Sequence, residues 1–213
     1  MRKTILNQNK DQKNSIATII LAAGASRRMG QPKQLLLYKE QTLLGYVTQC
    51  AISSECNPVI VILGANAEKI EPKIAQLPIK IVQNNNWNEG IASSIRCGIS
   101  YIQNQYLNLD GVVFLTCDQP FISTELIEQL IDAHYSTNKP IIASQYGEIL
   151  GIPALFSRSF FSALMQLQGD RGAKKIINQY PDLVYVINFP QGQIDLDTLE
   201  NYQQLISMND LNY

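Results

Sequence analysis

Short runs of consecutive apolar residues, spaced along the chain, most constrain what this sequence can fold into. Ile16–Leu21, Val59–Leu63 and Gly111–Thr116 are rich in Ile, Val and Leu and show no alternation between polar and apolar positions. Runs of this kind are typical of strands buried on both faces. Segments with helical spacing separate them, so we expect an α/β fold: a single-domain, Rossmann-like three-layer sandwich with a mostly parallel central sheet.

The remaining elements follow from the same patterns. Further strands are expected at 79–82, 140–143 and 183–187, and helices at 42–54, 67–75, 93–101, 123–134, 160–167, 173–179 and 198–207. Thr42 and Ser123 are residue types that cap the N-termini of helices. A chain of 213 residues suits one domain, which we expect to span 16–207 after a flexible polar lead-in at 1–15.

Composition and charge exclude several classes of protein. With 17 basic and 18 acidic side chains the formal net charge is -1, so we expect no strongly basic surface and no nucleic-acid partner. The longest apolar runs fall well short of the roughly 20 residues that span a bilayer, and the N-terminus lacks the apolar core of a signal peptide. We therefore expect a cytoplasmic protein that does not associate with a membrane. Four cysteines without a C-x-x-C pair, and a single histidine, predict reduced thiols and no zinc site.

A loop that contains glycine and basic residues follows the first expected strand. Ligands bind beyond the carboxyl ends of strands in open parallel sheets, and Gly24 would let backbone N–H groups approach a phosphate closely. Arg28 and Lys33, with Arg27 beside them, would supply positive charge to a triphosphate. The segment matches neither G-x-x-x-x-G-K-[S/T] nor G-x-G-x-x-G. The residues by themselves leave two readings open, a triphosphate-binding loop and an ordinary basic surface loop.

Carboxylates follow two other expected strands. Asp118 comes directly after the run Gly111–Thr116, at the same edge of the sheet as the glycine loop. Asp195 and Asp197 precede the last expected helix, and in an extended segment they would share one face. Carboxylate oxygens placed there suit Mg²⁺, which bridges carboxylates and phosphates. A turn or helix-capping role for Asp118 explains the residues equally well.

Residues 21–33 read LAAGASRRMGQPK and resemble the L-A-[A/G]-G-x-S-x-R-M-G-x-x-K signature of nucleotidyltransferases similar to molybdenum cofactor cytidylyl- and guanylyltransferases. Other segments resemble the same family: 84–96 with its N-x-x-W-x-x-G-x-x-S-S pattern, C-D-Q-P at 117–120, 151–156, 167–174, and D-L-D-T at 195–198. The sequence departs from the family at 199–201, where L-E-N replaces P-E-D. The resemblance covers about 16–202.

The resemblance implies a role for each matching residue. Arg28, Lys33 and Asp118 would be catalytic, and Asp118 would hold Mg²⁺ together with Asp195 or Asp197. The nucleotide or the acceptor would contact a larger set of residues: Leu21, Ala22, Ala23, Gly24, Ser26, Arg27, Gly30, Lys33, Asn84, Gly90, Ser93, Ser94, Gly151, Asp170, Gly172 and Lys174.

The reaction implied is transfer of CMP from CTP to the phosphate of molybdopterin, with release of pyrophosphate. Ala23 resembles the cytidylyl branch of the family, because the guanylyl branch tends to carry glycine there. A molybdoenzyme or its chaperone is a further expected partner. Two alternatives stay open: transfer to another phosphorylated acceptor, such as a sugar phosphate or methylerythritol phosphate, and a catalytically silent nucleotide-binding protein.

Overall fold

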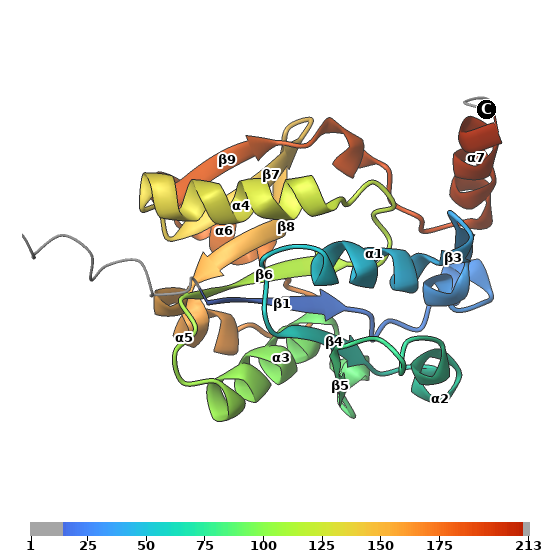
Figure 1. Cartoon of the computed structure of the whole chain (residues 1–213), viewed down its shortest axis with the longest axis horizontal. Helices are drawn as coiled ribbons and strands as arrows, with labels where there is room; N and C mark the ends of the chain where they lie inside the picture. The colour runs from blue at the N-terminus through green and yellow to red at the C-terminus, as the bar shows by residue number, and fades with distance from the viewer. Residues whose placement is uncertain (1–14, 211–213) are drawn as a thin grey trace, which may run out of the picture.

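The fold is a seven-stranded sheet covered by helices on both faces (Figure 1). A computed structural model describes residues 15–210 of the chain. In spatial order the strands are β5 (Lys80–Gln83), β4 (Val59–Leu63), β1 (Ile16–Leu21), β6 (Gly111–Thr116), β8 (Ile149–Ser157), β7 (Ile141–Tyr146) and β9 (Val184–Asn188). Only β8 among these strands runs against its neighbours β6 and β7, whereas the other pairs are parallel. The predicted three-layer fold with a mostly parallel sheet is confirmed.

The register of the central strands brings their ends together. Leu21 at the end of β1 pairs with Ile62 of β4 on one side and with Thr116 of β6 on the other. Because β8 is antiparallel to both β6 and β7, β7 and β9 run in the same direction as β1. The segments that follow β1, β6 and β9 therefore emerge at one edge of the sheet.

Two buried clusters separate the layers. On one face, α1 (Leu43–Ile52), α2 (Ala67–Ile70) and α4 (Thr124–Thr137) pack against the sheet, and on the other α3 (Ile91–Gln105), α5 (Phe161–Met165) and α6 (Lys174–Gln179) do so. Ile19 of β1 points into the second cluster and Ile20 into the first, and both are fully buried. This two-sided burial explains why the strand sequences are apolar at consecutive positions.

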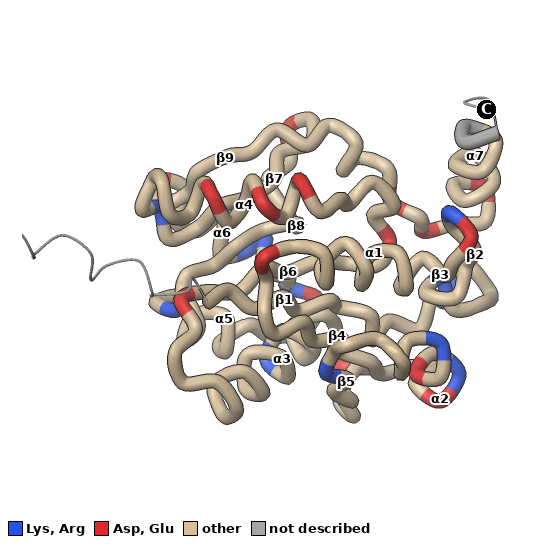
Figure 2. The backbone as a smooth tube through the Cα atoms, in the orientation of Figure 1, with Lys and Arg blue, Asp and Glu red and all other residues tan. Residues whose placement is uncertain are grey.

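The last helix lies apart from the sheet. Helix α7 (Leu199–Asp210) packs beside the small hairpin of β2 (Leu37–Tyr38) and β3 (Gln41–Thr42), where Leu205 and Tyr38 are buried in a third cluster. Figure 1 shows α7 standing at one end of the molecule, beside β3 and away from α5. No helix within 15–210 is long and apolar enough to cross a membrane. Figure 2 shows basic residues scattered from one end of the molecule to the other, with acidic ones among them.

Several expectations about local structure are settled by hydrogen bonds. The side chains of Thr42 and Ser123 accept bonds from Gly45 N (3.0 Å) and Leu126 N (3.3 Å), so both predicted helix caps are confirmed. The helix expected at 93–101 instead begins at Ile91 and ends at Gln105. The helix expected at 67–75 ends at Ile70, and a 3-10 turn that contains Pro72 follows.

Strand β8 was not predicted, because glycine and proline at 151 and 153 break its apolar run. The four cysteines are free thiols in the structure. Of the expected lead-in at 1–15, all but the last residue lies outside the described residues, so the proposed boundary at 16 stays a proposal.

Candidate nucleotide and metal site

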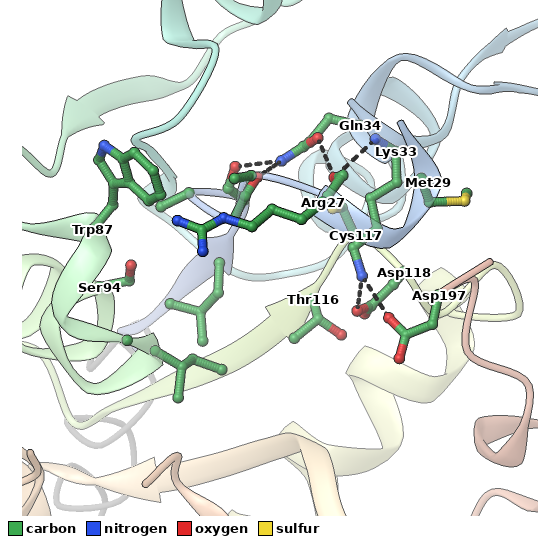
Figure 3. A pocket seen from close by; sticks show the side chains of 18 of the residues that line it. Arg27, Met29, Lys33, Gln34, Trp87, Ser94, Thr116, Cys117, Asp118 and Asp197 are labelled. Atoms are coloured by element: carbon green, nitrogen blue, oxygen red, sulfur yellow. Dashed lines mark hydrogen bonds and ion pairs between the residues drawn. The ribbon is translucent and has the colours of Figure 1, made fainter. Parts of the chain in front are cut away.

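An open cavity of about 560 Å³ lies at the edge of the sheet where β1 and β6 end. Its walls are the loop after β1, the first residues of α3 and the turn before it, the end of β6, and the side chains of Asp170 and Asp197. Figure 3 shows these side chains arranged around one space. The cavity thus joins segments that the sequence places far apart, and most of the predicted site residues belong to it.

The loop after β1 presents backbone donors at this cavity. Among the described residues, the N–H groups of Ala23 and Ala25 have no hydrogen-bond acceptor. A Cβ built on Gly24 would meet no atom within 4 Å, so this position opens onto free space. Unpaired N–H groups beside an open glycine suit the close approach of an anion such as phosphate.

Basic side chains of the same loop differ in what they contact. Lys33 Nζ lies 2.7 Å from Asp118 Oδ2 and 3.1 Å from Asp197 Oδ1, and Arg28 Nη2 lies 2.8 Å from Asp197 Oδ2. Burial is the largest single influence on the pKa of Lys33 and lowers it, but the charges of Asp118 and Cys117 and the hydrogen bonds to Asp118 and Asp197 together raise the pKa above its ordinary value. Arg27 has no ion pair within the described residues, and its side chain extends across the cavity toward Trp87 (Figure 3).

The carboxylates converge because the segment after β9 returns to the end of β6. The N–H of Leu196 donates to the carbonyl oxygen of Asp118 at 2.9 Å, which holds the two segments side by side. Burial, followed by the charges of Asp118 and Asp197, raises the pKa of Asp195 to about 6. For Asp197, burial works in the opposite direction, but hydrogen bonds and charge from Lys33 and Arg28 lower its pKa.

The donor set fits a divalent cation. The described residues contain no group of three or more His, Cys, Asp or Glu side chains spaced to hold a metal. They do contain a pair of carboxylates, Asp118 and Asp197, that share one ammonium group. If the ammonium group of Lys33 moved aside, the carboxylate oxygens of Asp118 and Asp197 could bind Mg²⁺ or Mn²⁺, since both ions prefer oxygen ligands.

The segment 84–94 divides into supporting and lining residues. Asn84 is buried, and its amide donates to Ser93 Oγ (2.8 Å) and Ser94 Oγ (3.0 Å) while accepting from Asn86 N (2.9 Å). Ser93 in turn donates to the carbonyl oxygen of Gly90 at 2.8 Å. Asn84 and Ser93 therefore hold the start of α3 in place, whereas the cavity is lined by Trp87, Asn88, Gly90, Ile91 and Ser94.

The wall near Trp87 is tightly packed. A Cβ on Gly64 would lie 2.6 Å from Trp87 Cβ and 2.9 Å from Ala23 Cβ. A side chain at position 64 would therefore displace Trp87 and Ala23 from their present positions. Gly64 directly follows β4, and none of its sequence neighbours indicates that it packs against Trp87. The close contact fixes Trp87 and Ala23 on adjoining parts of the cavity wall.

The segment 167–174 reaches the cavity through one residue. Asp170 lines it, and the carbonyl oxygen of Gly169 accepts from Ala92 N at 3.1 Å. Gly90 has a φ of 103°, and a Cβ there would collide with Asp170 and Gly169. Gly90 thus allows the turn at 169–170 to pack against the start of α3.

Seven predicted site residues lie outside the cavity lining: Asn84 and Ser93, which support α3, and Gly30, Gly151, Gly172, Lys174 and Asp195. Gly30 has a φ of 70° and ends the 3-10 turn Arg27–Met29. Gly151 is buried in β8, where its missing side chain leaves room for the hydroxyl of Tyr146. Ser26 is also internal to the loop, since its Oγ accepts from Lys33 N at 3.0 Å. Sequence reasoning missed Gln34 and Arg96, whose polar side chains carry no signal that separates them from surface residues.

Comparison with known proteins agrees with this geometry. Residues 18–184 match the family described as the MobA-like NTP transferase domain. A nicotine blue oxidoreductase of Paenarthrobacter nicotinovorans is 27% identical over 202 residues, which are 90% of this chain and 96% of that protein. A probable molybdenum cofactor guanylyltransferase of Bacillus mycoides is 28% identical over 129 residues, 59% of this chain and 62% of that protein.

Solved structures give the same result. The crystal structure of Rv0371c from Mycobacterium tuberculosis H37Rv superposes with a TM-score of 0.79 at 28% identity and covers 92% of this chain and 100% of that one. A second structure of Rv0371C is a complex with manganese, with a TM-score of 0.75 at 26% identity, and covers 91% of this chain and 99% of that one.

Proposed function

Because this chain belongs to the MobA-like NTP transferase family of nucleotidyltransferases, we propose that it transfers CMP from CTP to the phosphate of molybdopterin. In this reaction an oxygen of the acceptor phosphate bonds to the α-phosphorus of CTP, the bond from that phosphorus to the β-phosphate oxygen breaks, and pyrophosphate leaves. One observation carries the proposal. Lys33 joins Asp118 and Asp197 directly beside a loop that has N–H groups without an acceptor among the described residues and an open position at Gly24.

The residues of the chain would position the triphosphate and neutralise its negative charge. The N–H groups of the loop and the side chain of Arg27 would bind the β- and γ-phosphates, and Lys33 would turn from the carboxylates to the phosphates. Asp118 and Asp197 would hold Mg²⁺, which supplies neutralisation of the phosphate charge when bound. Manganese in the related Rv0371C structure supports a divalent cation. A phosphate acceptor is ionised at neutral pH, so no general base is required.

Cytosine is proposed as the base for a local reason. The Cβ atoms of Ala23 and Trp87 close one part of the cavity wall, and a residue without Cβ at 23 would leave more room for a purine. Relatives named as guanylyltransferases make GTP the first competitor to test. Asp170 lines the cavity and belongs to the segment that resembles the acceptor side of the family, so it is proposed to contact the molybdopterin acceptor.

The test is Mg²⁺-dependent release of pyrophosphate from CTP, GTP, ATP and UTP, with and without molybdopterin. We expect release from CTP only when both Mg²⁺ and molybdopterin are present. Release from GTP in preference to CTP would contradict the base assignment, and release with a sugar phosphate or methylerythritol phosphate would contradict the acceptor. Binding of a triphosphate without release under any condition would indicate the nucleotide-binding partner protein instead.

A further inference from the structure

We propose that Gln34 is a positioning residue that sets the nucleotide loop in its phosphate-binding conformation before the nucleotide arrives. The proposal rests on the proposed function, since it concerns the loop that would hold the triphosphate. Gln34 lies in the 3-10 turn Lys33–Leu35, next to the lysine that contacts Asp118. It is 1% exposed, which is rare for a glutamine and requires internal hydrogen-bond partners.

The amide of Gln34 is hydrogen-bonded to three residues of the loop. Its Nε2 donates to the carbonyl oxygens of Ala22 (2.8 Å) and Gly24 (2.9 Å). Its Oε1 accepts from the hydroxyl of Ser26 at 3.4 Å. Figure 3 shows the glutamine beside the loop with these bonds drawn. One side chain is therefore bonded to the loop at alternate residues over 22–26.

These bonds determine which way the loop's N–H groups point. In a trans peptide the carbonyl and the N–H of the same unit point in opposite directions. Since the carbonyls of Ala22 and Gly24 point to Gln34, the N–H groups of Ala23 and Ala25 point away from it. Both residues line the cavity, and both N–H groups lack an acceptor among the described residues. A peptide flip at either unit would instead turn a carbonyl oxygen toward the phosphates, where it would repel them.

The same glutamine supports a strained turn. Ser26 has a φ of 52° and a ψ of 39°, a left-handed conformation that is uncommon outside glycine. Its side chain is held from two sides, by Lys33 N at 3.0 Å and by Gln34 Oε1. The turn places Arg27 and Arg28 at the mouth of the cavity. Such strain persists only where neighbouring contacts hold it, and Gln34 supplies one of them.

The substitution Gln34→Met keeps the length and burial of the side chain and removes every hydrogen bond. Gln34→Glu keeps the shape but sets an oxygen against the two carbonyl oxygens. Gln76→Met is the matched control, because Gln76 Nε2 makes one exposed bond, to the carbonyl oxygen of Lys73 at 3.2 Å, far from the cavity lining.

Nucleotide affinity is measured by fluorescence of Trp87, which is the only tryptophan of the chain and lines the cavity. The probes are Mg–CTP and inorganic triphosphate, which lacks the base. Two further measurements are made on each variant: the melting temperature without ligand, and the KM and kcat for pyrophosphate release. For Gln34→Met we expect a folded protein, a Kd and a KM for CTP about tenfold higher or more, and a kcat nearly unchanged. We expect a larger loss for Gln34→Glu and none for Gln76→Met.

The outcomes are separable. A folded Gln34→Met protein that binds both probes as the unsubstituted protein does would overturn the positioning role and leave the proposed function standing. Failure of the unsubstituted protein to bind any triphosphate would overturn the proposed function, and this role for Gln34 with it. If neither variant folds, NMR of the unsubstituted protein decides: slow exchange of the Gln34 side-chain amide protons, with and without nucleotide, supports the proposal, and fast exchange in the free protein overturns it.

Discussion

Arg96 donates a hydrogen bond of 2.6 Å from Nη1 to the carbonyl oxygen of Leu167, across 71 residues of sequence. Its Nη2 also lies 2.6 Å from Glu89 Oε2. The arginine therefore ties three pieces together: helix α3, the 3-10 turn Trp87–Glu89 that precedes it, and the segment that carries Asp170. A guanidinium that bonds to both a carboxylate and a carbonyl fixes their relative position more firmly than a single bond would.

The change Arg96→Met should release the segment that carries Asp170. We expect the KM for the acceptor to rise about tenfold, while the Kd for CTP changes little, because among the described residues Arg96 bonds to Leu167 and Glu89 and not to the nucleotide loop. The free energy of unfolding should fall by about 1–2 kcal/mol, since the bonds are charged but partly exposed. Arg158→Met is the control, because Arg158 bonds the carbonyl of Leu107 away from the cavity lining. Equal effects of both substitutions on the acceptor KM would contradict this prediction.

Gly24→Ala should separate folding from nucleotide binding. A Cβ at this position meets no atom and the backbone is not left-handed, so we expect the free energy of unfolding to change by less than about 0.5 kcal/mol. Crowding at a packed contact costs about 1–3 kcal/mol, so the Kd for CTP should rise about tenfold to 100-fold. Calorimetric titration with Mg–CTP measures it, and unchanged affinity would show that phosphate does not approach Gly24.

Gly90→Ala should give the opposite result. The φ of 103° is strained for alanine, and the added Cβ would collide with Asp170 and the backbone of Gly169. We expect destabilisation by about 1–3 kcal/mol in chemical unfolding. An alanine variant as stable as the parent would mean that the turn at 169–170 moves freely away from α3.

Asp118→Asn should abolish transfer while the protein stays folded. The amide keeps the shape of the carboxylate but cannot neutralise a metal ion or Lys33, so we expect pyrophosphate release to fall about 100-fold or more. Asp132→Asn, on the exposed side of α4, is the control and should have full activity. Turnover of Asp118→Asn at the parent rate would remove Asp118 from the mechanism.

The pKa of Asp195 predicts how stability depends on pH. Burial and the neighbouring carboxylates raise it from 3.8 to about 6 in the folded protein. Between these values the folded state binds more protons than the unfolded state, so this group's contribution to stability falls as pH rises from about 4 to 6. Asp195→Asn should therefore raise the melting temperature at pH 7 and change it little at pH 4. A variant less stable than the parent at pH 7 would contradict this.

Much of the site follows from the order of elements. Parallel strands end at one edge of a sheet. The apolar runs that predict β1 and β6, and the polar residues that end them, therefore placed the loop after β1 correctly beside Asp118 after β6. The approach of the 195–197 segment to Asp118 was also expected. Its structural cause was not, because that cause is the antiparallel strand β8 between β6 and β7, which lets β7 and β9 run in the same direction as β1.

The remainder depends on contacts between side chains. Asn84 and Ser93 were expected at the ligand, but their hydrogen bonds are satisfied within the protein. Gln34 reads as an ordinary polar residue, since nothing in its neighbours shows that it turns inward to the carbonyls of Ala22 and Gly24. Arg96 meets Leu167 only because α3 and α5 share one face of the sheet. Hydrogen-bond partners of this kind are determined by how helices and loops pack in three dimensions, and the spacing of residues in the sequence does not predict that packing.

The ion pair of Lys33 with Asp197 spans 164 residues. During synthesis on the ribosome, the nucleotide loop is made first, and its carboxylate partner follows 164 residues later, beyond β9. A nascent or truncated chain that stops before Asp197 would contain the whole loop yet lack half of the paired carboxylates. The two carboxylates can therefore meet beside Lys33 only after the segment that follows β9 has been made and has folded onto the loop that follows β1.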